Sequence, residues 1–571
     1  MEIMKKYITK ENIIIITIAI FATILSSFFI FDKILYKGVD TEYHLSRIMG
    51  IVNSWNAKDF LAYIHVDETG YGYAMGFFYS NLFMILPCIL YKLGVNIFVI
   101  YKILIFLCGI FTATSMYICV KNITKSKYSA TIAMFLYTTC SYRIITMVSK
   151  GFIGELLSFI FIPIIILGLY KLIFENEKKW WIFSLGFVGI LNSNLVMTEI
   201  MIVISIIMII CNIKTIIKNK TRLIGFLKAT VMALLVSAVF WMPMLQQLYS
   251  TEFMLSEKKV IYQPFRWIIE FKDLFWGTIQ YKNNLASAYG LGLIFIIILP
   301  FRLKIKNQNT VTKFCDICIL TGLLLLLLMT NFFPWKQLRP IGEMLQFPSR
   351  LEVAISAFFA IACGIICGFT SKKKIKIVVF SVIVIWQTIM NIVCLDSCIK
   401  SLIQFNHVES KAQIGVEENF KYNICDGLYL PKEANHFIIQ MEKEQERYEE
   451  DIIKTNDKQL EYSYKKENLT VEIKFTNNNK ENTYIEVPLN YYYGYTAKSV
   501  NDETYYKIER GESGLVRIYL NNKSEDTIKI YYKTTNIQKI SVLVTSVTII
   551  GIAIYIVKKI KNKEVEIKQE E

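Results

Sequence analysis

The chain has 571 residues, of which 54% are hydrophobic, whereas soluble domains are about 45–50% apolar. Its 63 Lys and Arg residues outnumber its 47 Asp and Glu residues, and the formal charge is +16. Because the Lys residues lie in short loops between apolar blocks, this charge indicates membrane topology and excludes a nucleic-acid binder, whose basic residues would gather on one soluble face.

The N-terminal segment is basic and precedes an apolar run at 13–31. Asp32 and Lys33 follow this run, where a signal peptide would have small residues at its cleavage site. We therefore predict an uncleaved first span that begins in the cytoplasm.

Twelve apolar runs are predicted to span the membrane, since roughly 20 apolar residues cross its hydrocarbon core. This assignment places the Lys-rich short loops on one side, as the positive-inside rule expects, with both termini in the cytoplasm. A further run, Phe77–Leu93, would invert every later loop if it crossed, so we interpret it as interfacial or re-entrant. The predicted fold class is an α-helical polytopic membrane protein with about 12–13 transmembrane helices. The twelve runs are 13–31, 96–120, 128–148, 151–174, 180–194, 195–213, 223–249, 288–302, 314–332, 347–370, 375–395 and 537–558.

Charged residues near the outer ends of these runs are the first candidates for function, because charge inside a bilayer costs about 2.5–3.5 kcal/mol even on lenient scales. The first outer loop, predicted at 32–95, contains Asp40, His44 and Arg47. Asp40 and His44 are four residues apart and would share a face of a helix. A carboxylate here could act as a general base or bind a divalent metal. It could equally belong to an ordinary solvated loop, and the spacing does not decide between the two.

Two more charged clusters map to the same predicted face. Arg143 and Lys150 could bind a phosphate, and Glu155 could be a second acid or could complement the N-terminus of its helix. Arg339 and Arg350 belong to the third cluster, where Arg350 could hold a lipid-linked phosphate or extend to lipid headgroups. The sequence has no Walker loop, G-x-G-x-x-G or H-E-x-x-H motif, which disfavours an ATPase or a soluble nucleotide enzyme.

Towards the C-terminus the apolar pattern changes to a period of two, which is typical of half-buried strands. Strands are predicted at 469–475, 484–489, 504–509, 515–520 and 527–532. We expect three domains: a transmembrane domain at 1–395, an extracytoplasmic β-rich sandwich domain at 396–536, and a C-terminal helix with a basic cytoplasmic tail at 537–571. The sandwich contains a tyrosine cluster that either binds a glycan or packs on the sheet: Tyr491, Tyr492, Tyr493 and Tyr495.

Several stretches resemble the GT-C superfamily of membrane glycosyltransferases. More specifically, they resemble the bacterial membrane proteins labelled 6-pyruvoyl-tetrahydropterin synthase-related, which are near relatives of the YfhO-type family. The label's pterin enzyme is not implied, since nothing in the chain fits that soluble fold or its zinc site. The matching stretches are GVDTEYHLSRIMGI (38–51), GYGYAMGFFYSNLF (70–83), CSYRIITMVSKGFIGELLSFIFIPIIILGLYKL (140–172), LQFPSRL (345–351) and DGLYLP (426–431).

The resemblance implies that a sugar is moved from a polyprenyl-phosphate donor to an envelope glycopolymer on the outer face of the membrane. Asp40 would match the superfamily's acidic residue after the first span and would deprotonate or orient the acceptor hydroxyl, with Glu155 as the second catalytic acid. No cofactor is certain, although a divalent metal ion could take part. The residues that would bind the substrate and its phosphate are His44, Arg47, Arg143, Lys150, Arg339 and Arg350.

The sequence departs from the family pattern at three places. Lys150-Gly151 stands where Arg-Gly is common, Ser349 where a Trp often precedes the arginine, and Ser193-Asn194 where Ser-His is common. Two other functions stay open: a transporter or flippase for a lipid-linked glycan, and a non-catalytic envelope assembly protein. The expected partners are the bilayer, a lipid-linked sugar and the envelope polymer, with no nucleic acid.

Overall fold

The computed structural model describes residues 9–67, 70–175, 177–256, 279–282, 285–288, 293–335, 337–338, 345–405, 412–413, 427–434, 453–478, 483–520 and 523–570. The chain divides into two compact units. The first unit contains residues 1–44, 93–233 and 262–421, and the second contains residues 45–92, 234–261 and 422–571.

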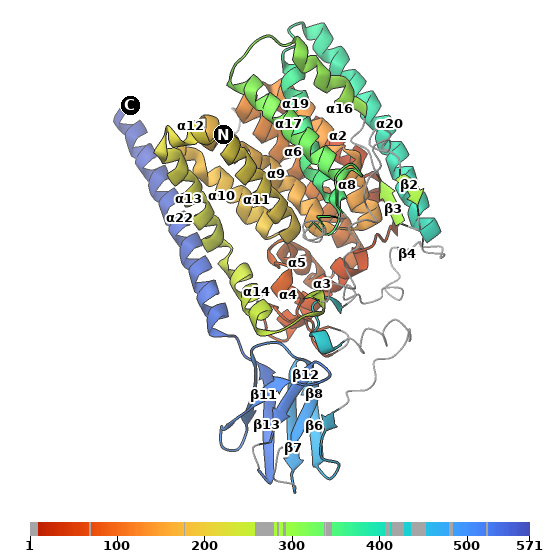
Figure 1. Ribbon diagram of the computed structural model, residues 1–571, viewed down its shortest axis with the longest axis vertical. Helices are drawn as coiled ribbons and strands as arrows, with labels where there is room; N and C mark the ends of the chain where they lie inside the picture. Colours follow the sequence, from red (N-terminus) through yellow and green to blue (C-terminus); the bar gives the residue numbers. More distant parts are fainter. Residues whose placement is uncertain are drawn as a thin grey trace. The chain divides into compact units, whose positions relative to one another are not determined.

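The first unit is a bundle of apolar helices, drawn in red to turquoise in Figure 1. Two short strand pairs accompany them, β1 (Ile34–Leu35) with β4 (Ala412–Gln413) and β2 (Ile279–Lys282) with β3 (Leu285–Ala288). The helices are α2 (Lys10–Ser26), α6 (Ile97–Thr124), α7 (Lys127–Thr138), α8 (Ser141–Ile145), α9 (Ile153–Phe174), α10 (Trp180–Leu191), α11 (Leu195–Cys211), α12 (Ile213–Ile217), α13 (Lys220–Val236), α16 (Leu293–Ile298), α17 (Thr310–Met329), α19 (Glu352–Gly368) and α20 (Lys373–Phe405).

Helix length and composition confirm a multi-pass membrane protein. Each of the twelve predicted runs contains a helix, but some helices are too short to cross alone, such as α10 with 12 residues. The run Phe77–Leu93 contains the end of α4 (Met75–Phe78), the 3-10 helix η2 (Leu82–Met84) and the short helix α5 (Ile85–Lys92), and its interfacial placement stays a prediction. Within the described residues, seven helical stretches are long and apolar enough to span, with the bent pair α13 and α14 (Ala238–Ser250) as an eighth: Ile97–Thr124, Lys127–Lys150, Ile153–Phe174, Thr310–Met329, Pro348–Gly368, Lys373–Lys400 and Asn536–Asn562.

Three of these stretches form the interior of the first unit: 127–150, 153–174 and 348–368 are almost wholly buried. Helix α6 packs against α7 and α9, and α19 packs against α7 and α17. Their apolar residues point in all directions, as expected for helices surrounded by others. The end of the first stretch and the beginnings of the other two carry the charged residues predicted from the sequence.

The junction between the first two buried stretches is irregular. Residues Thr146–Lys150 form a π-helical segment, a rare conformation that is frequent at functional sites. Gly151 follows in the left-handed region with a φ of 68°, and α9 begins at Ile153. Glycine adopts this φ without strain, so the first stretch ends and α9 begins within a few residues.

The second unit contains α3 (Thr41–Asn56) for most of its length and the C-terminal β domain. One antiparallel sheet has the strand order β10-β9-β13-β7-β6 and the other β11-β12-β8-β5. Alternate residues of β7, Val471, Ile473 and Phe475, are buried, as the period of two predicts. The long helix α22 (Asn536–Glu570) follows the last strand. The strands are β5 (Lys454–Thr455), β6 (Glu461–Glu467), β7 (Thr470–Thr476), β8 (Tyr484–Asn490), β9 (Tyr495–Ser499), β10 (Tyr505–Tyr506), β11 (Ile508–Arg510), β12 (Leu515–Tyr519) and β13 (Glu525–Tyr532).

Candidate functional site

The backbone just before α3 lies against the end of the π-helical segment. The Val39 N–H donates to the Ser149 carbonyl (3.2 Å), and the Asp40 N–H donates to the Lys150 carbonyl (2.9 Å). These two bonds join Val39 and Asp40 to a helix end that is distant in sequence, and they fix the position of the backbone directly before α3.

Two glycines permit this close approach. A Cβ at Gly38 would lie 2.6 Å from the Val148 carbonyl oxygen, and a Cβ at Gly151 would lie 2.8 Å from the Thr41 backbone nitrogen. Real Cβ atoms do not come this close to backbone atoms that cannot move aside. A larger side chain at either position would therefore push the loop and the helix end apart.

Asp40 is half-buried and directly precedes α3. Its carbonyl accepts the His44 N–H (3.1 Å), so its carboxylate stands at a helix N-terminus, where negative charge is favoured. The carboxylate also interacts electrostatically with Tyr101 of α6, whose hydroxyl donates to the Gly151 carbonyl (3.4 Å). Asp40 is therefore held beside the helix end.

Lys150, Glu155, Arg350 and Glu352 form a buried charge cluster at the ends of the three interior stretches. None of the four is more than 7% exposed. Arg350 Nε lies 3.2 Å from Glu155 Oε2, and the Thr146 hydroxyl donates to Glu155 Oε1 (3.3 Å). Charges buried within membrane helices are expensive and mark functional sites by default.

Aromatic rings surround both cations of this cluster. The Lys150 ammonium donates to the Tyr142 hydroxyl (2.8 Å) and lies 4.4 Å from the centroid of that ring. The Phe347 ring lies 4.9 Å from Lys150 Nζ and 4.4 Å from Arg350 Cζ. Ring faces attract cations where water is excluded, so the Phe347 ring stabilises both positive groups.

Several polar atoms of residues 349–352 are buried without a hydrogen-bond partner among the described residues. They are Arg350 Nη1, the Ser349 hydroxyl and both carboxylate oxygens of Glu352. Folded proteins leave few such groups unsatisfied, and each one calls for an explanation. The set combines donors with an acceptor, so a ligand that carries both acidic oxygens and hydroxyl groups, such as a phosphorylated sugar, would satisfy it.

Arg143 does not join the buried charge cluster. Its fully buried guanidinium donates to the Ser26 hydroxyl (2.8 Å) and the Thr138 carbonyl (3.3 Å). Its neighbour Tyr142 contacts the cluster instead, because adjacent residues of a helix point in different directions. Arg143 therefore lies apart from the cluster within the first unit, and its phosphate-binding role remains a prediction.

Three other predicted residues also lie elsewhere or cannot be placed. His44 is buried and packs edge-on against the Tyr43 ring, with centroids 5.2 Å apart. Arg47 belongs to the second unit, where it lies 5.4 Å from the centroid of the Tyr79 ring. Arg339 is outside the described residues. The roles of all three stay predictions.

Two members of the site were not predicted as site residues. Glu352 belongs to the third charged cluster predicted from the sequence, by the argument that selected Glu155, but no role was assigned to it there. Tyr142 gave no comparable signal, because a tyrosine in an apolar helix is ordinary. Among the described residues, no group of three or more His, Cys, Asp and Glu side chains is arranged to hold a metal ion, so the divalent metal considered above has no assigned ligands.

Comparison with known proteins places most of this site within a recognised family region. A family model described as "Bacterial membrane protein YfhO" matches residues 66–409, a range that includes the whole buried charge cluster and begins after Asp40. An uncharacterized protein of Lactococcus lactis subsp. cremoris (strain MG1363) is 24% identical over 351 residues, which cover 59% of this chain and 56% of that protein. The chain thus spans little more than half the length of that relative.

Proposed function

The chain belongs to the YfhO family of bacterial membrane proteins, and from this premise we propose that it is a GT-C-type membrane glycosyltransferase. In this proposal it moves a sugar from a polyprenyl-phosphate donor to an acceptor of the cell envelope. The reaction takes place at the buried charge cluster and Asp40, on the outer face of the membrane. The placement of the Lys-rich short loops supports this orientation.

The observation that carries the proposal is the unsatisfied state of residues 349–352. Arg350 keeps its Nη1 without an acceptor, although its Nε is paired with Glu155. A donor phosphate at this guanidinium would complete a charge-assisted contact, the kind for which arginine is preferred. Lys150 supplies a second positive charge beside the same Phe347 ring.

The two carboxylates of the cluster have different surroundings and therefore different proposed roles. Glu155 accepts a hydrogen bond from Thr146 and forms an ion pair with Arg350. Its proposed role is to position the Arg350 guanidinium. Glu352 has no donor at either oxygen among the described residues, and sugar hydroxyls would supply donors.

Asp40 would act on the acceptor. In the proposed step the bond between the anomeric carbon and the phosphate oxygen breaks, and a bond forms from that carbon to the acceptor hydroxyl oxygen. The hydroxyl proton passes to the Asp40 carboxylate, and the phosphate leaves on its lipid with its charge held by Arg350 and Lys150. No nucleotide is needed, in keeping with the lack of nucleotide-binding motifs in the sequence.

Substitution of the proposed base tests this function in cells. Asp40→Asn keeps the shape of the side chain but removes its ability to take a proton, so sugar on the envelope polymer should fall to the level of a deletion strain at unchanged protein amount. Asp396→Asn is the matched control, since Asp396 lies on α20 with its side chain 57% exposed, paired with Lys400. Wild-type glycosylation in the Asp40→Asn strain would reject the assignment.

A further inference from the structure

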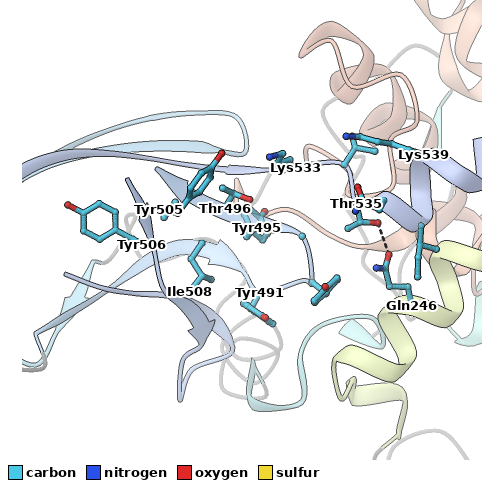
Figure 2. A pocket seen from close by; sticks show the side chains of 16 residues that line it. Gln246, Tyr491, Tyr495, Thr496, Tyr505, Tyr506, Ile508, Lys533, Thr535 and Lys539 are labelled. Carbon is cyan, nitrogen blue, oxygen red and sulfur yellow. Dashed lines mark hydrogen bonds between the residues drawn. The ribbon is translucent and has the colours of Figure 1, made fainter. Parts of the chain in front are cut away.

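A tyrosine-rich pocket lies in the second unit, between the β domain and the first turn of α22. Its volume is about 730 Å³, which falls within the range of small-ligand sites. Figure 2 shows Tyr505 and Tyr506 at one end and Gln246 and Lys539 at the other. The pocket is independent of the buried charge cluster, which belongs to the first unit.

The aromatic lining of the pocket has the chemistry of a saccharide site. Tyr493 and Tyr505 are exposed, with 44% and 54% of their surface accessible, and Tyr491 is half-buried. Tyrosine offers a ring face to the apolar side of a sugar and a hydroxyl to its polar edge. The ring of Tyr495, which also lines the pocket, is buried.

The charged lining is entirely positive. Lys533 and Lys539 contribute two positive charges, and no Asp or Glu is among the described residues that line the pocket. Both lysines are exposed, and Lys533 Nζ lies 5.7 Å from the centroid of the Tyr505 ring. An anionic group bound here would therefore meet two cations and no carboxylate.

The walls of the pocket are held in place before any ligand binds. The Thr535 hydroxyl and Gln246 Oε1 are 2.7 Å apart, a contact drawn in Figure 2. Gln247 donates from its amide to the Tyr493 carbonyl (2.7 Å) and accepts the Tyr493 N–H (3.1 Å). At the far end, the Tyr506 hydroxyl donates to Asp526. Walls fixed in this way lower the entropic cost of binding.

The composition of the lining argues against an acyl chain as the occupant. Among the described residues, the aliphatic side chains of the lining are Ala497, Ile508 and Ile537, too few to form a hydrophobic channel. Tyrosine rings and hydroxyl, amide and ammonium groups line the rest of the pocket.

The described lining combines tyrosines with two lysines and contains no carboxylate. From this we propose that the pocket binds a phosphate-bearing saccharide of about two sugar units. The pocket holds the sugar on the exposed tyrosine rings and the phosphate between Lys533 and Lys539. This binding needs no transfer reaction, so it stands or falls separately from the proposed glycosyltransferase.

Calorimetry on the full-length protein in phosphatidylcholine nanodiscs tests this proposal, with trehalose 6-phosphate as the probe. Trehalose and inorganic phosphate are measured alongside it. We expect the phosphorylated disaccharide to bind at least about tenfold more tightly than either, since both halves of the pocket contribute. The double variant Lys533→Gln/Lys539→Gln should bind it no better than trehalose, and Tyr505→Ala should weaken both sugars.

The matched control is Lys474→Gln/Lys529→Gln, which removes two exposed lysines from β7 and β13 outside the pocket. It should bind like the wild type, and thermal unfolding of each variant checks its folding. Equal losses in the control pair would reject the pocket as the site of binding. Inorganic phosphate that binds as tightly as the probe would reject the saccharide. Loss of binding when phosphatidylglycerol is added to the nanodiscs would make a lipid headgroup the occupant and overturn the proposal.

Discussion

The Asp40 N–H donates to the Lys150 carbonyl across 2.9 Å. This bond joins the acidic residue after the first helix to a residue of the buried charge cluster. A change that separates these two backbones should therefore slow the proposed sugar transfer while the core of the helical bundle stays packed.

Gly38→Ala makes that separation directly. Its Cβ would lie 2.6 Å from the Val148 carbonyl oxygen and 2.7 Å from the Gly151 nitrogen, so the loop must move and carry Asp40 with it. A misplacement of about 1 Å can lower a rate by about 100-fold, and we expect a loss of that order in sugar transfer by isolated membranes. Gly551→Ala in α22 is the control, since nothing lies within 4 Å of its Cβ. Transfer at the wild-type rate in Gly38→Ala would contradict the role of the docked loop.

Glu155→Gln should destabilise the first unit. Removing one member of a buried ion pair leaves the other charge uncompensated, at a cost of about 3–5 kcal/mol. We expect a lower thermal midpoint for the purified protein, and partial recovery when Arg350→Met is added. Asp396→Asn breaks the exposed pair with Lys400, which should change stability little. Equal midpoints for Glu155→Gln and Asp396→Asn would be inconsistent with a buried pair.

Replacement of Lys150 by arginine should preserve activity, whereas replacement by methionine should reduce it. Both Lys and Arg place a cation over the Tyr142 and Phe347 rings, whereas methionine fills the space without charge. Lys150→Arg should keep most activity, and Lys150→Met should raise the KM for the lipid donor as well as lower kcat. The kinetics of the two variants measure this difference. Equal losses in both would mean that the position requires lysine itself rather than its charge.

The stability of the second unit should depend on pH through His65. This side chain is fully buried, and burial, assisted by the nearby charge of Arg47, lowers its pKa from 6.5 to about 3. Below pH 6.5 the unfolded chain takes up a proton that the folded protein excludes, so stability is complete above that pH and declines towards pH 3. Thermal midpoints measured from about pH 7 down to pH 4 should fall. The thermal midpoint of His65→Leu should fall less steeply with decreasing pH than that of the wild type. An identical slope in the two proteins would assign the effect to other groups.

The helices could be predicted from the sequence because each apolar run is long and carries its own signal. The strands were predicted less completely. Almost every residue of β6 is exposed. In β9, the buried residues include the small residues Ala497 and Ser499. Neither strand therefore shows the apolar alternation that reveals β7.

The site could be predicted only in part. Charge in apolar surroundings selected Lys150, Glu155 and Arg350, and that argument is local to each run. The pairing of Arg350 with Glu155 joins two helices distant in sequence, and a spacing pattern contains no information about it. Arg143 illustrates the same limit, because its sequence neighbour Tyr142 faces the cluster and it does not.

Reconstituted transfer is the most direct test of the central claim. Full-length protein in liposomes is given polyprenyl phosphates that carry different labelled sugars, together with envelope polymer, and label on the polymer is counted. We predict transfer by the wild type with at least one donor, and a loss of at least about 100-fold in Asp40→Asn with donor binding retained. Equal rates for the two proteins, or donor binding and outward movement of the lipid without any transfer, would contradict the account.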